Sequence, residues 1–152
     1  MLIIWTDNLS VGMKAFDDDH KRLIQIINEL HYLVQEGKAE GQIPLEEIEI
    51  QLHRLENYTR YHCACEEKLL AMTRYPKLAE HKLEHENLIA KIADMSERFK
   101  GSTCPSDAEE LMNFAYEWVR DHISSTDKEY AEHLRSFDLS PDDFRSKLAA
   151  GR

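Results

Sequence analysis

The sequence predicts an all-α protein, an up-down-up-down antiparallel four-helix bundle with an N-terminal arm and a short C-terminal helix. Three observations favour this fold. In four segments, apolar residues recur at alternating intervals of three and four, which is the pattern of a helix with one buried face. These segments hold roughly 22 to 32 residues each and are joined by short connections, as in antiparallel bundles. Only five Gly and four Pro, the residues that interrupt helices, occur among 152 residues.

The first half of the chain contains the arm and two predicted helices. We expect residues 1–12 to form the arm and residues 13–36 to form the first helix, with Gly37 as its left-handed stop. The second helix is expected to begin at Pro44, because proline suits the first helical position, and to break at residues 74–76, which include a second proline.

The second half of the chain contains two more long helices. The third is expected to end at Gly101, and the fourth to begin within residues 103–106, around Pro105, and to reach Asp127. The sequence Ser-Pro-Asp-Asp at residues 140–143 predicts the start of a short terminal helix.

Length and composition indicate one domain. A chain of 152 residues is long enough for one well-buried core and short for two. We therefore assign residues 1–135 to the bundle with its arm, and residues 136–152 to a C-terminal extension. The three cysteines are an odd number without paired spacing, which favours reduced thiols.

The charge balance argues against two classes of partner. With a net charge of -10 and a pI near 5.2, the chain lacks the excess of Lys and Arg that binding to nucleic acid or to an anionic membrane requires. The apolar run at residues 2–5 is too short for a signal peptide, and no segment approaches the ~20 apolar residues that span a bilayer. We expect a cytoplasmic protein that does not insert into a membrane.

Polar residues interrupt the apolar stripes at seven positions. They are His20, His62, Glu66, His81, His85, His122 and Asp127. An unpartnered imidazole or carboxylate in a core costs several kcal/mol, so this many inward polar groups need an explanation. A metal centre accounts for all of them; the alternative is a buried hydrogen-bond network without metal.

The spacing of the seven residues supports the metal centre. His62 and Glu66, like His81 and His85, are four residues apart, so each pair lies on one helix face. The seven positions lie near the start of the first and third helices and near the end of the second and fourth helices. In an antiparallel bundle these places meet at one end. His122 and Asp127 are five apart and point about 140° away from each other on a regular helix. We therefore predict a bulge between residues 121 and 127.

These residues occur in recognisable motifs: WTDNLSVG at 5–12, DDDHKRL at 17–23, HCACEE at 62–67, HKLEH at 81–85 and WVRDHISSTD at 118–127. Together they resemble the hemerythrins, specifically the single-domain bacterial members, from Trp5 to about Tyr130. The resemblance implies a four-helix bundle that holds two iron ions with a bridging oxo or hydroxo group.

The resemblance also implies a role for each of the seven residues. His81, His85 and His122 bind one iron, His20 and His62 bind the other, and Glu66 and Asp127 bridge the two. The second iron then keeps an open position for dioxygen. Five residues next to a ligand or one turn away are the candidates for the wall of the oxygen pocket: Leu23, Cys63, Trp118, Val119 and Ile123. Tyr130, one turn after Asp127, is a candidate for orienting a ligand.

Cys63 and Cys65 do not form a zinc site together, because residues two apart in sequence point about 200° away from each other on a helix. For Cys65 the interpretations are a packing residue or, less favoured, a redox-sensitive thiol. At the position of Cys63 the hemerythrins usually carry phenylalanine. The smaller thiol leads to the hypothesis of a wetter pocket and faster autoxidation of the irons.

The function expected from these features is reversible binding of dioxygen for carriage, storage or delivery, without enzymatic turnover beyond weak redox activity. The alternative is a di-iron redox enzyme or sensor that acts on peroxide, nitric oxide or oxygen. A third interpretation, docking of a protein partner controlled by the iron state, stays open because of the C-terminal extension.

Overall fold

The computed structural model describes residues 2–100 and 105–137, and within these residues it contains helices and no strand. The helices are α1 (Lys14–Glu40), α2 (Leu45–Met72), α3 (Leu78–Lys100), α4 (Pro105–Trp118), a π-helix (Val119–Thr126) and α5 (Asp127–Arg135). A short 3₁₀ turn at Asp7–Leu9 lies in the arm. The predicted all-α fold is confirmed.

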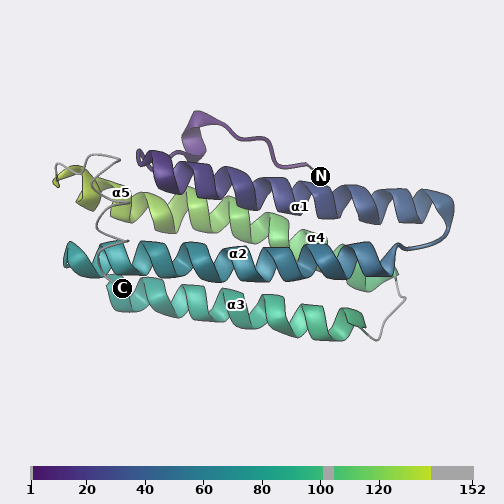
Figure 1. Ribbon diagram of the computed structural model, residues 1–152. Coiled ribbons are helices and arrows are strands. Elements are labelled where there is room, and N and C mark those ends of the chain that lie inside the picture. Colours follow the sequence, from purple (N-terminus) through teal and green to yellow (C-terminus); the bar gives the residue numbers. More distant parts are fainter. Residues whose placement is uncertain (1, 101–104, 138–152) are drawn as a thin grey trace.

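Figure 1 shows α1, α2, α3 and the α4 to α5 column running side by side in alternating directions, as the short connections predict. The arm lies along α1. It is fixed there by Asn28, whose side chain accepts a hydrogen bond from the Ile3 amide (2.9 Å) and donates one to the Ile3 carbonyl (2.8 Å). The arm therefore belongs to the packed bundle.

The core consists of two apolar clusters. The larger one contains the later parts of α1 and α3, the early part of α2, and residues of α4 and the π-helix, and includes Leu30, Leu52 and Ile92. The smaller one contains the opposite ends of α1 and α2 together with α5, and includes Phe16 and Tyr130. Along α1 and α2, the polar positions singled out above lie between members of the two clusters. The polar layer is thus enclosed by an apolar layer on either side.

The end of α1 differs from the prediction. Gly37 does not stop the helix, which continues to Glu40 and ends at Gly41, where φ is 72°. Gly37 instead lies where the returning chain crosses α1: a Cβ there would be 2.6 Å from Pro44 Cδ and 2.9 Å from the Gln42 carbonyl oxygen. Close packing against the returning chain, and not helix termination, is therefore the reason for glycine at this position.

The other predicted helix starts and the end of the second helix agree with the structure within one or two residues, whereas the fourth helical segment continues past Asp127 as α5 to Arg135. Pro44 is the residue before α2, and α2 ends before Thr73, with the turn made by Arg74 at φ 55°. α4 begins at Pro105. The predicted stop at Gly101, Thr103 and Cys104, and the predicted helix from residue 140 to 151 all lie outside the described residues.

The predicted bulge before Asp127 is confirmed. The eight residues Val119–Thr126 form a π-helix, whose wider turn places residues five apart on the same face. His122 and Asp127 consequently point in the same direction despite their spacing.

None of the helices in the described part of the chain is both long enough and apolar enough to cross a membrane.

Candidate metal centre

All seven polar residues predicted from the sequence lie in one buried cluster. His20 comes from α1, His62 and Glu66 from α2, His81 and His85 from α3, His122 from the π-helix and Asp127 from the first turn of α5. Their exposed fractions range from 0% for His20, Glu66 and Asp127 to 6% for His122. The structure therefore brings together every residue of the predicted set and leaves none outside; their role as iron ligands stays a prediction.

The seven residues form two groups that share both carboxylates. One group joins Glu66 and Asp127 with His81, His85 and His122, and the other joins the same two carboxylates with His20 and His62. In each group the candidate ligand atoms lie within 4.8 Å of one another. This division matches the two iron sites that the family resemblance implies.

Glu66 directs one oxygen to each group. Its Oε1 lies 3.2 Å from His62 Nε2 and 3.6 Å from His20 Nε2, while its Oε2 lies 3.3 Å from His85 Nε2 and 3.4 Å from His81 Nε2. A carboxylate with its oxygens divided in this way has the arrangement that bridging two cations requires.

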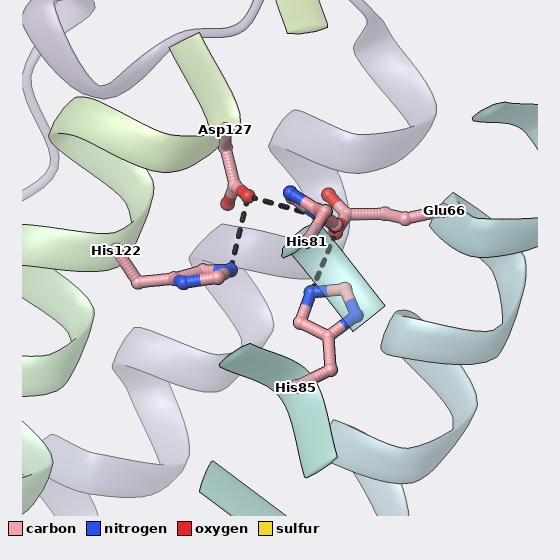
Figure 2. Close-up of side chains that lie close together, drawn as sticks. All are labelled: Glu66, His81, His85, His122 and Asp127. Carbon is pink, nitrogen blue, oxygen red and sulfur yellow. Dashed lines mark hydrogen bonds and ion pairs between the residues drawn. The ribbon is translucent and has the colours of Figure 1, made fainter. Parts of the chain in front are cut away.

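Asp127 repeats the arrangement from the other side of the cluster. Its Oδ2 lies 3.2 Å from His20 Nε2, and its Oδ1 lies 3.1 Å from His122 Nε2 and 3.7 Å from His81 Nε2. Figure 2 shows the three-histidine group with Glu66 and Asp127 converging on one point from different helices. All five histidines present Nε2 to this interior.

The electrostatics of the cluster favour charged groups. Burial acts to lower the pKa of His62, but Glu66 and Asp19 outweigh it and raise the pKa to about 10. Burial and the charge of Glu66 act to raise the pKa of Asp127, but His122 and His20 outweigh them and lower the pKa to about 2. Without metal, His62 therefore carries a proton and Asp127 a negative charge at neutral pH.

Several polar atoms of the cluster fit a metal ion better than a hydrogen-bond network. Nε2 of His85, Nε2 of His122 and both oxygens of Asp127 are buried and lack a hydrogen-bond partner, although nitrogens and oxygens lie close together. Leaving such atoms unsatisfied is costly, and coordination to cations would satisfy all of them at once. Imidazole nitrogens with bridging carboxylates are a ligand set that suits iron.

Three further carboxylates contact the outer nitrogens of the histidines, and the sequence did not single them out for this role. Asp19 Oδ2 lies 3.3 Å from His62 Nδ1, Glu67 Oε1 lies 2.9 Å from His85 Nδ1, and Glu84 Oε2 lies 3.2 Å from His122 Nδ1. We call these three the outer carboxylates.

The outer carboxylates follow a regular order. Each lies directly next to a candidate ligand in the sequence and contacts a histidine on the next helix: α1 to α2, α2 to α3 and α3 to the π-helix. With Nδ1–H donated to a carboxylate, the Nε2 lone pair of each histidine is directed to the interior. Adjacency to a ligand was the only signal in the sequence.

Aromatic side chains fix other members of the cluster. The fully buried hydroxyl of Tyr130 donates a hydrogen bond to Glu66 Oε1, so the predicted contact of this tyrosine with a ligand is confirmed. Phe16 packs edge-on against His62 with ring centroids 5.9 Å apart. Trp118 stacks on His122, with centroids 5.1 Å apart and 20° between the planes.

The candidate wall residues are mostly buried. Leu23, Val119 and Ile123 are completely inaccessible and belong to the larger apolar cluster, whereas Trp118 is partly buried. Cys63 is buried and free, and burial raises the pKa of its thiol, so it stays protonated. Cys65 is only half-buried and packs against the smaller apolar cluster, in agreement with the packing interpretation.

Comparison with known proteins agrees with this geometry. The family described as "Hemerythrin HHE cation binding domain" matches residues 11–134, most of the chain. The chain belongs to the hemerythrin family. The match begins at the end of the arm and includes all seven cluster residues.

Among hemerythrin relatives, a bacteriohemerythrin of Stenotrophomonas maltophilia is 31% identical over 137 residues, which are 89% of this chain and 83% of that protein. A bacteriohemerythrin of Pseudomonas aeruginosa is 33% identical over 133 residues, 88% of this chain and 82% of the relative. A crystal structure of wild-type hemerythrin superposes with a TM-score of 0.70 at 26% identity, covering 88% of this chain and 98% of that one.

Proposed function

We propose that this hemerythrin binds dioxygen reversibly at a pair of irons. His81, His85 and His122 would hold one iron, His20 and His62 would hold the other, and Glu66 and Asp127 would be shared by both, with an oxo or hydroxo group as a further bridge. The observation that carries this proposal is the division of each shared carboxylate, one oxygen toward each histidine group. A buried hydrogen-bond network without metal does not need this division.

The surrounding residues exclude water from the centre and fix the orientation of its side chains. Two ferrous ions held by these residues would supply the two electrons that dioxygen accepts when it binds. Leu23, Val119 and Ile123 exclude water from the centre, which slows loss of the ligand and autoxidation. The outer carboxylates hold the imidazoles in one orientation, and Tyr130 holds Glu66. Because the histidine groups are unequal, an iron held by His20 and His62 would keep an open position for dioxygen.

The ligand set supports binding of oxygen over its consumption. Five neutral imidazoles and two carboxylates donate less negative charge to the irons than a set with four carboxylates would, so the higher oxidation states that cleave oxygen are less stabilised. We infer that the protein carries, stores or delivers dioxygen in the cytoplasm. We expect it neither to bind nucleic acid nor to act as an enzyme. The acidic charge of the chain and the bacteriohemerythrin relatives support this role.

The test is an optical titration of the iron-loaded protein. The protein is reduced, exposed to air and then freed of oxygen, while iron is counted per chain. We expect two irons and an absorption band that appears with oxygen and disappears without it. A band that decays at once to the oxidised centre, with turnover of added peroxide or nitric oxide, would support the redox enzyme instead.

The control uses two histidine variants. His122→Ala removes a member of the cluster and should lower the iron content, whereas His53→Ala changes an exposed histidine and should not. Equal iron content in the two variants would contradict the assignment of the site.

A further inference from the structure

Glu84 contacts two residues of the π-helix with a single oxygen. Its Oε2 accepts a hydrogen bond from the Thr126 hydroxyl (2.8 Å) and lies 3.2 Å from His122 Nδ1. Glu84 itself lies on α3 between two cluster histidines, His81 and His85. The contact therefore joins the π-helix directly to the stretch of α3 that contributes to the three-histidine group.

The π-helix is the part of the site that most needs such a contact. π-helices are rare, because their wide turns pack the backbone less well than an α-helix does. The hydroxyls of Ser124 and Ser125 donate back to the carbonyls of Arg120 and Asp121, four residues earlier in the same segment. Thr126, the last residue of the segment, instead reaches across to Glu84.

Asp19 makes a comparable pair of contacts elsewhere in the site. Its two oxygens contact Tyr58 (2.7 Å) and His62 (3.3 Å), which are also four residues apart on one helix. However, α2 is a regular α-helix of 28 residues and does not depend on this contact for its shape. The π-helix has eight residues and carries one cluster member within it and another directly after it.

The two contacts of Glu84 therefore affect the positions of both His122 and Asp127. With His122 Nδ1–H directed to Glu84, its Nε2 faces Asp127 Oδ1 at 3.1 Å. Thr126 precedes Asp127 in the chain, so fixing its side chain fixes the start of α5. We propose that Glu84 is a positioning residue that stabilises the π-helix, aligns His122 with Asp127 and slows the release of the metal they hold. That the metal is iron rests on the proposed function.

The surroundings of Glu84 make the inference testable without disturbing the core. Its side chain is 51% exposed. It lies at the edge of an open cleft of about 330 Å³, which is also lined by Trp118, His122 and Thr126. Truncation of Glu84 to alanine thus removes both contacts and leaves both apolar clusters unchanged.

The first experiment measures iron release to a chelator. Removing the outer partner of a metal-bound histidine typically weakens metal binding by about 10- to 100-fold, so Glu84→Ala should release iron faster by roughly that factor. Thr126→Val, which keeps the side-chain shape, should also accelerate release, and Thr126→Ser, which restores the hydroxyl, should return it to the wild-type rate. The matched control is Glu86→Ala, which removes an exposed carboxylate from the same helix.

The second experiment measures amide hydrogen exchange of residues 119–126 in the metal-free protein. Exchange should be faster in Glu84→Ala than in both the wild type and Glu86→Ala. If the wild type retains iron and Glu84→Ala matches Glu86→Ala in both experiments, the inference is wrong while the proposed function stands. If the wild type takes up no iron, the proposed function is wrong, and the exchange result alone decides whether Glu84 holds the π-helix.

Discussion

The hydroxyl of Tyr130 in α5 donates a hydrogen bond to Oε1 of Glu66 in α2, and both side chains are fully buried. This is the same oxygen that faces His20 and His62. Tyr130→Phe keeps the ring and removes only this donor. Because a hydrogen bond to a charged group contributes about 1.5–3 kcal/mol, the metal-free variant should lose about that much free energy of unfolding.

In the iron-loaded form, the same substitution should lower the midpoint potential, because a carboxylate that accepts one hydrogen bond fewer donates more charge to iron. Chemical denaturation and a redox titration check the two effects. Tyr32→Phe, at an exposed tyrosine, serves as the control and should change neither quantity. An unchanged potential in Tyr130→Phe would refute the electrostatic part of the prediction.

Cys63→Phe should slow autoxidation, because the larger apolar ring displaces water from the oxygen pocket. Since Cys63 is already buried, enlarging it should also cost about 1–3 kcal/mol of stability. Conversion of the oxygenated to the oxidised spectrum gives the rate, and thermal unfolding gives the cost. Cys65→Phe, at the half-buried thiol two residues later, should leave autoxidation unchanged. If Cys63→Phe autoxidises at the wild-type rate, the hypothesis of a wetter pocket is wrong.

Iron uptake should release protons. The pKa of His62 is raised to about 10 without metal, against burial, by Glu66, Asp19 and Asp127, so at neutral pH the ring must lose a proton before it binds iron. The pKa values of His20 and His122 are raised as well. Apparent iron affinity should therefore increase with pH up to about 10. Calorimetric titration in two buffers of different ionisation enthalpy counts the protons; a count of zero at pH 7 would contradict the prediction.

The same shift affects the stability of the metal-free protein. Because the pKa of His62 rises from 6.5 to about 10 on folding, its contribution to stability is complete below about pH 6.5 and is lost as the pH rises through about 10. Asp127, with a pKa lowered from 3.8 to about 2, contributes above pH 3.8 and loses its contribution as the pH falls through about 2. Denaturation of the metal-free chain as a function of pH measures the loss of stability at high pH and at low pH.

Gly37→Ala should destabilise the protein, although alanine favours a helix interior over glycine by about 1 kcal/mol. The added Cβ would collide with backbone atoms of Gln42 and Ile43 at 2.9 Å, and these cannot move without shifting the turn between α1 and α2. Thermal unfolding of the variant gives the sign. A more stable variant would show that the turn has room to move.

Leu30→Ala should lower the free energy of unfolding by about 2–5 kcal/mol, since it removes a completely buried side chain from the larger apolar cluster. Iron content should stay at the wild-type value, because Leu30 lies more than two helical turns from His20 on α1. Ile50→Ala, at an exposed position of α2, should change stability by no more than about 0.5 kcal/mol. Loss of iron in Leu30→Ala would indicate that the two layers are coupled.

The helices and the polar cluster could be predicted because both follow from one periodic signal. A residue such as His85 reveals itself as a polar interruption of an apolar stripe, and no tertiary information is needed to see that it points inward. The bulge was predictable for the same reason: His122 and Asp127 both had to face inward, and a regular helix does not allow it.

The roles of Glu84 and Gly37 could not be predicted from the sequence, because they depend on residues that are close in space but not adjacent in sequence. Glu84 and Glu86 are both acidic residues adjacent to His85, yet only Glu84 faces the π-helix, and the sequence does not contain the rotation of one helix against another. Gly37 was assigned to a helix end for the same reason, since its close contact is with a chain segment that arrives several residues later.

The position of the polar layer between two apolar layers has a consequence for the order of maturation. None of the apolar residues in either layer is a candidate ligand, and the charges of the metal-free centre compensate one another. We therefore expect the polypeptide to fold before it receives its ions. This separates it from small zinc domains, in which the metal itself drives folding.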